Sequence, residues 1–156
     1  MASQRVPTSP RLISRPEASS PAVRRRMQAT PRRDTPCELA IRTALHKLGL
    51  RFRVDWCLPG TRRRADIAFV GARVAVFING CFWHGCPLHA TWPKANATWW
   101  REKIEANRRR DADTDSRLRS NGWLVLRFWE HDDSAGAAKR IARVIRSKQR
   151  LSRKAR

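Results

Sequence analysis

A short run of metal-binding residue types stands in the middle of the chain. Cys81, Cys86 and His89 lie within nine residues, in a stretch with little else to hold a loop in place. Two thiolates and an imidazole suit Zn²⁺, and a closed structural site needs a fourth ligand. We favour His131, because it would staple the loop to a core strand, and His84 is the local rival. The alternative is a pair of buried thiols with unrelated histidines.

A single carboxylate interrupts an apolar segment earlier in the chain. Asp66 stands among Ala, Ile, Phe and Val, directly after an arginine cluster. A carboxylate in such a strand needs a partner or a cation. A divalent cation such as Mg²⁺ takes oxygen ligands, often one or two carboxylates together with substrate phosphate. An ion pair with Arg64 at the exposed start of the strand is the alternative, and spacing alone does not separate the two.

Polar residues also interrupt the inner face of a long predicted helix. At spacings of four, three, four and seven, that face carries Trp100, Ile104, Asn107, Asp111 and Leu118. Asn107 and Asp111 therefore either cap the edge of the core or point into a site. Glu38 lies in the first turn of another predicted helix, and spacing alone favours a capping glutamate there.

Two adjacent aromatic residues, Phe82 and Trp83, lie inside the Cys/His run. A rigid aromatic platform there could stack on bases or wedge between them. Tryptophan is more often a core residue, but two neighbouring large aromatics on one loop cannot easily both point inward. A base-contacting role therefore stands beside the packing role.

The charge of the chain indicates a polyanionic partner. Its 156 residues include 34 Lys and Arg against 13 Asp and Glu, a formal net charge of +21. Such a chain binds nucleic acid or an anionic membrane surface. No apolar run approaches the roughly 20 residues that span a bilayer, and no signal peptide opens the chain, which favours nucleic acid. Ribosomal or merely compositional basicity is the alternative. Without an export signal, the four cysteines are expected to be thiols or metal ligands.

The elements that must position these residues follow from periodicity and punctuation. Residues 1–33, rich in Pro, Ser and Arg, are predicted to be a disordered basic arm, either inert or ordering on DNA. An ordered domain over 34–148 and a basic tail over 149–156 follow. The domain opens with a helix capped by Thr35 and ended by Gly49. Strands are expected at 51–56, 65–70, 73–78 and 123–129, and further helices at 98–119 and 135–147. This order predicts one α/β domain, a mixed sheet flanked by helices.

Together these segments resemble the Vsr family of mismatch endonucleases. The motifs that carry the resemblance run in family order, as Asp34–Glu38, Arg64–Ile67, Val76–Pro87, Asn107–Asp111 and Gly122–His131. The Gly-Cys-Phe-Trp-His stretch is the most specific of them. The resemblance implies a restriction-endonuclease-like core with a structural zinc. It also implies Mg²⁺-dependent nicking of one DNA strand 5′ to the thymine of a T:G mismatch, which arises by deamination of 5-methylcytosine and is removed by very short patch repair.

The resemblance also implies roles for single residues. Asp66 would bind Mg²⁺ with the main-chain carbonyl of Ile78, and Glu38 would reach the waters of the metal. His84 would be the general base on the attacking water, with Asp111 as its acidic neighbour. The family's zinc positions fall on Cys81, Cys86, His89 and His131, a Cys₂His₂ set in which ligand types are exchanged relative to some relatives.

DNA contacts are expected from several places. By resemblance, Met27, Phe82 and Trp83 would wedge into the duplex beside the mismatch. Many family members carry a second active-site histidine where this chain has Asn79, which can still hydrogen-bond phosphate. The arginine cluster consists of Arg62, Arg63 and Arg64, and guanidinium groups suit phosphate contacts.

The expected partner is double-stranded DNA with a T:G mismatch, bound by a monomer in the bacterial cytoplasm at the nucleoid, away from membranes. Mismatch-repair proteins are candidate partners. Two other hypotheses compete. One is a nuclease on the same core that recognises another lesion or a short sequence. The other is a non-catalytic, zinc-stapled DNA-binding module.

Overall fold

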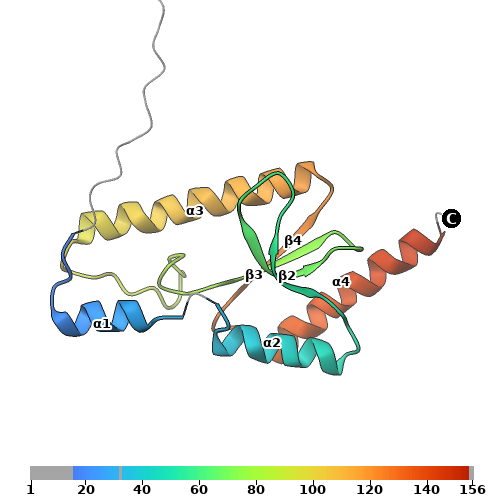
Figure 1. Ribbon diagram of the computed structural model, residues 1–156, viewed down its shortest axis with the longest axis horizontal. Coiled ribbons are helices and arrows are strands. Elements are labelled where there is room, and N and C mark those ends of the chain that lie inside the picture. Colours follow the sequence, from blue (N-terminus) through green and yellow to red (C-terminus); the bar gives the residue numbers. More distant parts are fainter. Residues whose placement is uncertain (1–15, 32, 155–156) are drawn as a thin grey trace, which may run out of the picture.

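The computed structural model describes residues 16–31 and 33–154, which build one mixed sheet with helices on both faces (Figure 1). The strands are β1 (Arg53–Cys57), β2 (Arg64–Phe69), β3 (Val74–Asn79) and β4 (Leu124–Trp129). The helices are α1 (Pro21–Ala29), α2 (Pro36–Lys47), α3 (Ala97–Ser120) and α4 (Ser134–Lys154). This confirms the predicted α/β class and the order of elements from α2 to α4.

The sheet has the strand order β1-β2-β3-β4. Its first two pairings, β1 with β2 and β2 with β3, are antiparallel. Strands β3 and β4 are parallel, from Val74 opposite Leu124 to Asn79 opposite Trp129. A parallel pair needs a long crossover connection, and α3 supplies it. The segments that follow β3 and β4 therefore leave the sheet at the same end. The Cys/His run follows β3 there, and His131 follows β4.

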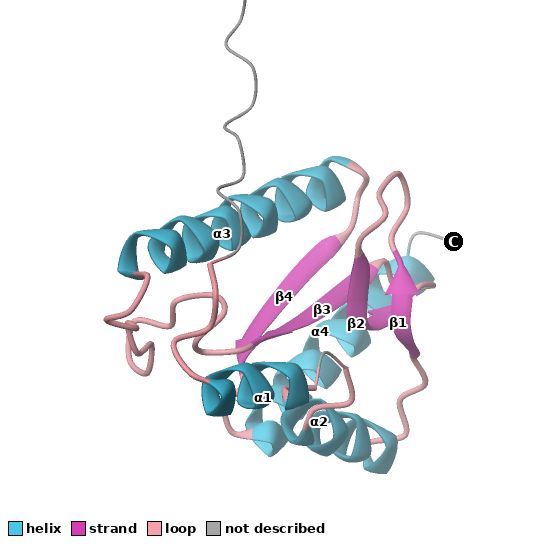
Figure 2. Cartoon of the chain, turned by 60° about the vertical axis from the view of Figure 1, so that its left-hand side comes forward, coloured by secondary structure: helices cyan, strands magenta, loops and turns pink. Residues whose placement is uncertain are grey.

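Each face of the sheet has its own core. On one face α2 and α4 pack with Ile67, Val74 and Val76. On the other face, below α3, Leu118 packs with Ala68 and Ala75. Figure 2 shows α3 on one side of the strands and α2 and α4 on the other. Successive side chains of β3 point into the two cores in turn, so the strand is covered on both faces, as its nearly unbroken apolar sequence predicts.

The start of α2 follows from its sequence. The Thr35 side chain accepts a hydrogen bond from the Glu38 N–H at 3.4 Å, and Pro36 is the first helical residue. Proline is suited to that position because its missing N–H would have no partner in the first turn. The predicted N-cap is therefore confirmed, while the returning hydrogen bond of the predicted capping box differs, because the Glu38 side chain accepts from the N–H of Asp34, one residue before the cap.

Two expectations about the ends of the chain need correction. Helix α1 forms inside the segment predicted to be disordered, with Ser20 as its N-cap and Pro21 at its first position. It buries no residue, so it has no apolar periodicity for a pattern to detect. Helix α4 continues to Lys154 rather than ending near 147, so most of the predicted tail is helical. The rest of the predicted arm, residues 1–15 and 32, lies outside the described residues. Among the described helices, none has the length and apolar character of a membrane span.

Candidate functional site

Four metal-binding side chains gather where β3 and β4 end. The Sγ atom of Cys81 lies 3.1 Å from Nδ1 of His131. The Sγ atom of Cys86 lies 3.8 Å from the same nitrogen and 3.9 Å from Nδ1 of His89. One ligand atom from each of these four residues lies within 4.8 Å of the other three. His84, the local rival, is not part of this group. The four side chains are thus related in space, which contradicts the alternative of unrelated histidines.

The chemistry of the cluster suits a cation. Burial, together with the neighbouring thiol of Cys86, raises the pKa of the Cys81 thiol to about 12. Two buried thiols at this distance resist ionisation unless a positive charge is present. Two sulfurs and two imidazole nitrogens are also the donor set of a closed structural zinc site. The residues present therefore fit a zinc ion.

The loop that carries the cluster is fastened from two sides. The Cys81 N–H donates to Oε1 of Glu130 at 2.6 Å, which ties the loop to the end of β4. From α3, Asn107 Nδ2 donates to the Trp83 carbonyl at 2.8 Å and Arg108 Nη2 donates to the Gly85 carbonyl at 2.5 Å. Asn107 thus interrupts the inner face of α3 because it holds this loop.

His84 forms a close pair with a carboxylate from α3. Its Nδ1 lies 2.5 Å from Oδ2 of Asp111, and both side chains are about one-fifth exposed. Burial acts to raise the pKa of Asp111, but the hydrogen bond to His84 and the charges of Arg127 and Arg110 outweigh it, so the pKa lies below its usual range. An ionised carboxylate can only accept, so Nδ1 of His84 carries the proton. In the neutral ring the other nitrogen, Nε2, is then an acceptor.

Asp66 lies in β2 and is hydrogen-bonded to the main chain of the neighbouring strand β3. Its Oδ2 accepts a hydrogen bond of 2.7 Å from the Ile78 main-chain N–H. Arg64 points elsewhere and pairs with Asp55 at 2.8 Å, so the alternative ion pair between Asp66 and Arg64 is wrong. Burial, which the hydrogen bond from Ile78 only partly offsets, and the negative charge of Glu38 together raise the pKa of Asp66 to about 6.

A divalent cation next to Asp66 would stabilise the ionised carboxylate that burial disfavours. Mg²⁺ binds through one or two carboxylates and retains waters or phosphate oxygens. Asp66 with the nearby main-chain carbonyl of Ile78 fits that minimal protein contribution. In the described part of the chain, the Cys/His cluster is the only group in which three or more His, Cys, Asp or Glu side chains lie close enough together to hold an ion. Any Mg²⁺ site at Asp66 would thus depend on waters and substrate for its other ligands.

Glu38 behaves first as a capping residue. Its side chain is 4% exposed, and it accepts hydrogen bonds from the Thr35 hydroxyl at 3.0 Å and from the Asp34 N–H at 2.9 Å. It also pairs with Arg42 at 2.9 Å. The capping interpretation is therefore confirmed, while the charge of Glu38 still acts on Asp66.

Arg127 of β4 was not predicted and is the centre of a polar network. Its guanidinium group lies 4.4 Å from the centre of the Phe77 ring. It donates to Asn79 Oδ1 at 3.1 Å and to the Asp115 carboxylate at 2.7 Å, and lies 3.7 Å from Asp111 Oδ1. A lone charge inside an otherwise apolar strand, the signal that identified Asp66, could also have found Arg127.

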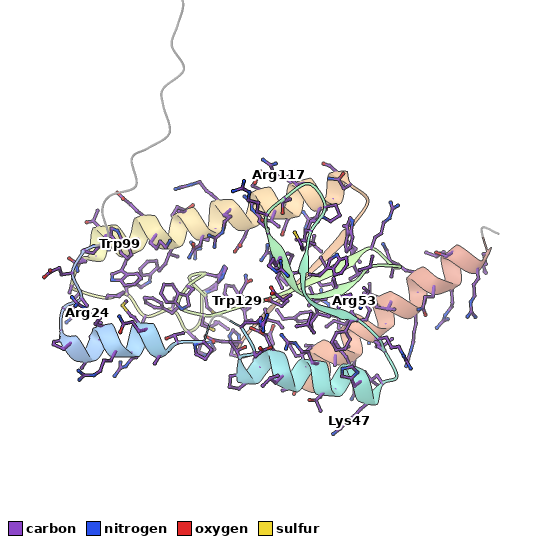
Figure 3. The ribbon with its side chains drawn as sticks, viewed as in Figure 1. Arg24, Lys47, Arg53, Trp99, Arg117 and Trp129 are labelled. Carbon is purple, nitrogen blue, oxygen red and sulfur yellow. The ribbon has the colours of Figure 1, made fainter. Side chains whose placement is uncertain are left out.

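The candidate DNA-contacting residues are more dispersed. Phe82 and Trp83 are half-buried, and their rings pack against Trp100 of α3 at centroid distances of 5.1 and 5.9 Å. Met27 is partly exposed on α1. Figure 3 shows Arg24 of α1 and Trp99 of α3 at the same end of the molecule.

The arginine cluster divides between protein contacts and solvent. Arg63 binds α3 through Asp113 at 2.8 Å, and Arg64 binds Asp55. Arg62 is exposed. Two of the three arginines therefore already hold carboxylates of the protein.

The sheet order, the crossover helix and the Cys/His cluster beside a His–Asp pair define an α/β protein with a candidate metal centre. The sequence model of one family, described as DNA mismatch endonuclease Vsr, matches residues 18–89. The chain is 46% identical over 112 residues to the type II nicking enzyme V.NaeI of Lentzea aerocolonigenes, covering 70% of this chain and 68% of that protein. The chain belongs to the Vsr family.

Two further relatives support this assignment. The type II nicking enzyme V.NmeDIP of Neisseria meningitidis serogroup C is 37% identical over 132 residues, 81% of this chain and 88% of that protein. The DNA mismatch endonuclease Vsr of Escherichia coli strain K12 is 41% identical over 107 residues, 67% of this chain and 66% of that protein. The similarity therefore reaches well beyond the Cys/His run.

Proposed function

We propose that the chain is a DNA endonuclease with a restriction-endonuclease-like core that nicks one strand 5′ to the thymine of a T:G mismatch. The observation that carries the proposal is the His84–Asp111 pair. Its geometry gives the imidazole a fixed tautomer with a free Nε2 acceptor, which a general base needs. The names of the relatives, DNA mismatch endonuclease and nicking enzyme, support the same activity.

In the proposed reaction, Nε2 of His84 takes a proton from the attacking water. The oxygen of that water forms a bond to phosphorus as the bond to the leaving sugar oxygen breaks, and the leaving oxygen takes a proton from solvent water. Asp111, ionised and bonded to Nδ1, stabilises the imidazolium that forms. When bound by Asp66 and the Ile78 carbonyl, Mg²⁺ would supply Lewis-acid polarisation of the phosphate. Glu38 would contact the waters of the metal through lone pairs beyond the hydrogen bonds that it already accepts.

A structural zinc ion is part of the proposal. Its ligands would be Cys81, Cys86, His89 and His131, whose donor atoms lie within 4.8 Å of one another. With four protein ligands the site is closed, so zinc would hold the loop rather than take part in the reaction. The loop in turn carries His84, which links the metal to the geometry of the base.

Recognition of the mismatch would combine charge with wedging. The net charge of +21 provides phosphate attraction that does not depend on sequence. Met27, Phe82 and Trp83 would enter the duplex beside the T:G pair, because a mismatched pair costs less to unstack than a sound one. Asn79 and Arg62 would contact phosphate. The enzyme would act as a monomer on chromosomal DNA in the cytoplasm, since one chain carries every residue of the proposed site.

The test is nicking of end-labelled duplexes that differ in one base pair. We expect Mg²⁺-dependent cleavage 5′ to the thymine in T:G DNA and none in T:A, C:G or other mismatched controls. Cleavage at another lesion or at a matched sequence would favour a nuclease of different specificity. Tight binding of T:G DNA without cleavage, with and without Mg²⁺, would favour the non-catalytic binding module and reject the proposal.

A further inference from the structure

Most of the donors of Arg127 are used within the protein. Its Nε donates to Asp115 at 3.0 Å, and its Nη2 donates to Asp115 at 2.7 Å and to the Asp111 carbonyl at 3.3 Å. Its Nη1 donates to Asn79 at 3.1 Å and faces the Asp111 carboxylate at 3.7 Å. A guanidinium group has five N–H donors, and four of them are used in these hydrogen bonds, while the 3.7 Å contact with Asp111 is an ion pair without a hydrogen bond. Arg127 therefore has at most one donor left for a DNA phosphate, although its side chain is 21% exposed.

Arg127 decides which way the Asn79 amide is turned. A guanidinium group only donates, so the amide oxygen of Asn79 must face it and the NH₂ group must face away. Asn79 is 8% exposed. Among the described residues no hydrogen bond from its Nδ2 is found, yet Nδ2 is not one of the fully buried atoms that lack a partner. The NH₂ group therefore keeps contact with solvent, and a phosphate oxygen can replace water as its acceptor.

The main chain of Asn79 adjoins the proposed metal site. Asn79 directly follows Ile78, whose N–H binds Asp66. The charge of Arg127 acts on Asp66 as well as on Asp111, so the three groups share one electrostatic environment. A phosphate oxygen at the metal site is an acceptor that the Asn79 NH₂ group can bind in place of water.

We infer that Arg127 is a positioning residue for nicking, which turns the Asn79 NH₂ group toward the scissile phosphate and holds Asp111 against His84. This inference rests on the proposed function. Arg127 acts through two other side chains and not by contact with DNA. Its loss should therefore slow the reaction while leaving the affinity for DNA nearly unchanged.

The test needs a variant that does not leave buried charges unpaired. Arg127→Met combined with Asp115→Asn removes one charge of each sign from the network. The exposed pair of Arg117 with Asp113 at 3.0 Å supplies the matched control Arg117→Met. We expect the double variant to nick T:G DNA about 10- to 100-fold more slowly at saturating enzyme, the usual cost of losing a partner that orients a site residue. The dissociation constant for the same DNA and the rate of the control should stay near wild type.

A double-mutant cycle separates positioning from general damage to the fold. Asn79→Ala should slow nicking in the wild-type background, but should cause little further loss once Arg127 has been replaced, because the amide is then no longer oriented. Losses that simply multiply would overturn the inference. Equal losses in rate and in DNA affinity would overturn it as well, because they would make Arg127 a direct DNA contact or a purely structural residue.

A measurement without catalysis distinguishes failure of this inference from failure of the proposed function. The side-chain NH₂ resonances of Asn79, assigned by their loss in Asn79→Asp, report how the amide is held. They should move in the Arg127→Met/Asp115→Asn variant and stay in place in Arg117→Met. Unchanged Asn79 resonances in the double variant would refute the positioning role whether or not the wild-type protein nicks T:G DNA. Absence of wild-type nicking with moved resonances would refute the function alone.

Discussion

Two histidines five residues apart are expected to lose activity for different reasons when each is replaced by alanine. His84 pairs with Asp111 and lies outside the four-residue cluster, whereas His89 belongs to the cluster. In His84→Ala we expect the rate of nicking to fall about 10²- to 10⁴-fold, the usual contribution of a general base. In His89→Ala we expect loss of zinc and of thermal stability together with activity.

The structure also limits how far His84→Ala can destabilise the fold. The substitution removes one hydrogen bond to a charged group, and Asp111 keeps Arg127 nearby at 3.7 Å. The expected cost is about 1–2 kcal/mol, which corresponds to a melting temperature lower by about 2–8 °C in a domain of this size. That loss is too small to unfold the protein at assay temperature, so the fall in rate would report on chemistry.

The assay measures three quantities on one preparation of each variant: zinc content, melting temperature and single-turnover nicking of T:G DNA at saturating enzyme. Wild type and His84→Ala should each hold about one equivalent of zinc. Zinc loss and unfolding in His84→Ala would make His84 a metal ligand. Nicking near the wild-type rate would remove it from the mechanism, and either result would refute the assignment of His84 as the base.

Three further predictions follow from single contacts. Asp66→Asn keeps an acceptor for the Ile78 N–H but loses the negative charge that would bind Mg²⁺. It should therefore abolish nicking and leave DNA binding nearly intact. Near-normal nicking by this variant would exclude Asp66 as the metal ligand. Because burial raises the pKa of Asp66 from 3.8 to about 6, the carboxyl group favours the folded state below pH 4 and loses that effect as the pH rises through 6. Without added Mg²⁺, Asp66→Asn should therefore gain unfolding free energy over wild type between pH 4 and 7, by about 2–3 kcal/mol in denaturant titrations, and a pH-independent difference would contradict the burial argument. Gly85→Ala should destabilise by about 1–3 kcal/mol, because Gly85 has φ +61° and an added Cβ would lie 2.9 Å from Ile104. Its matched control is Gly71→Ala, whose Cβ would meet nothing within 4 Å, and equal melting temperatures for the two variants would refute the steric argument.

The sequence predicted the elements that bury an apolar face. Strand β3 and helix α3 were found within a few residues of their true bounds, because hydrophobic periodicity and turn residues mark them. Helix α1 was missed because it buries no side chain, so only its N-terminal residues distinguish it from disorder. The extra length of α4 was missed for a related reason, since its last turn is exposed.

The partners of the site residues were harder to predict than their positions. The spacing on α3 brought Asp111 to the inner face, but only the fold showed that it meets His84 while Asn107 holds the loop. Arg127 carried the same local signal as Asp66, a charge in an apolar strand, but its role could not be predicted, because its partners come from β3 and α3 and contacts between elements leave no trace in local spacing. For Glu38 the sequence allowed two roles, capping of the helix and contact with the waters of the metal. In the fold Glu38 has the capping role, and its charge also acts on Asp66.

The link between the Cys/His loop and His131 has a consequence for how the chain folds. Cys81 and His131 are 50 positions apart, and the segment between them contains the whole crossover from β3 to β4. Closing a ring of that size by a firm link would remove about 4 kcal/mol of chain entropy from the unfolded state. The parallel pairing of β3 with β4 is also the most non-local join in the sheet, and such joins are slow to form. A zinc ion captured early would bring the two strand ends together, so the supply of zinc during synthesis would set how fast the chain folds as well as how stable it becomes.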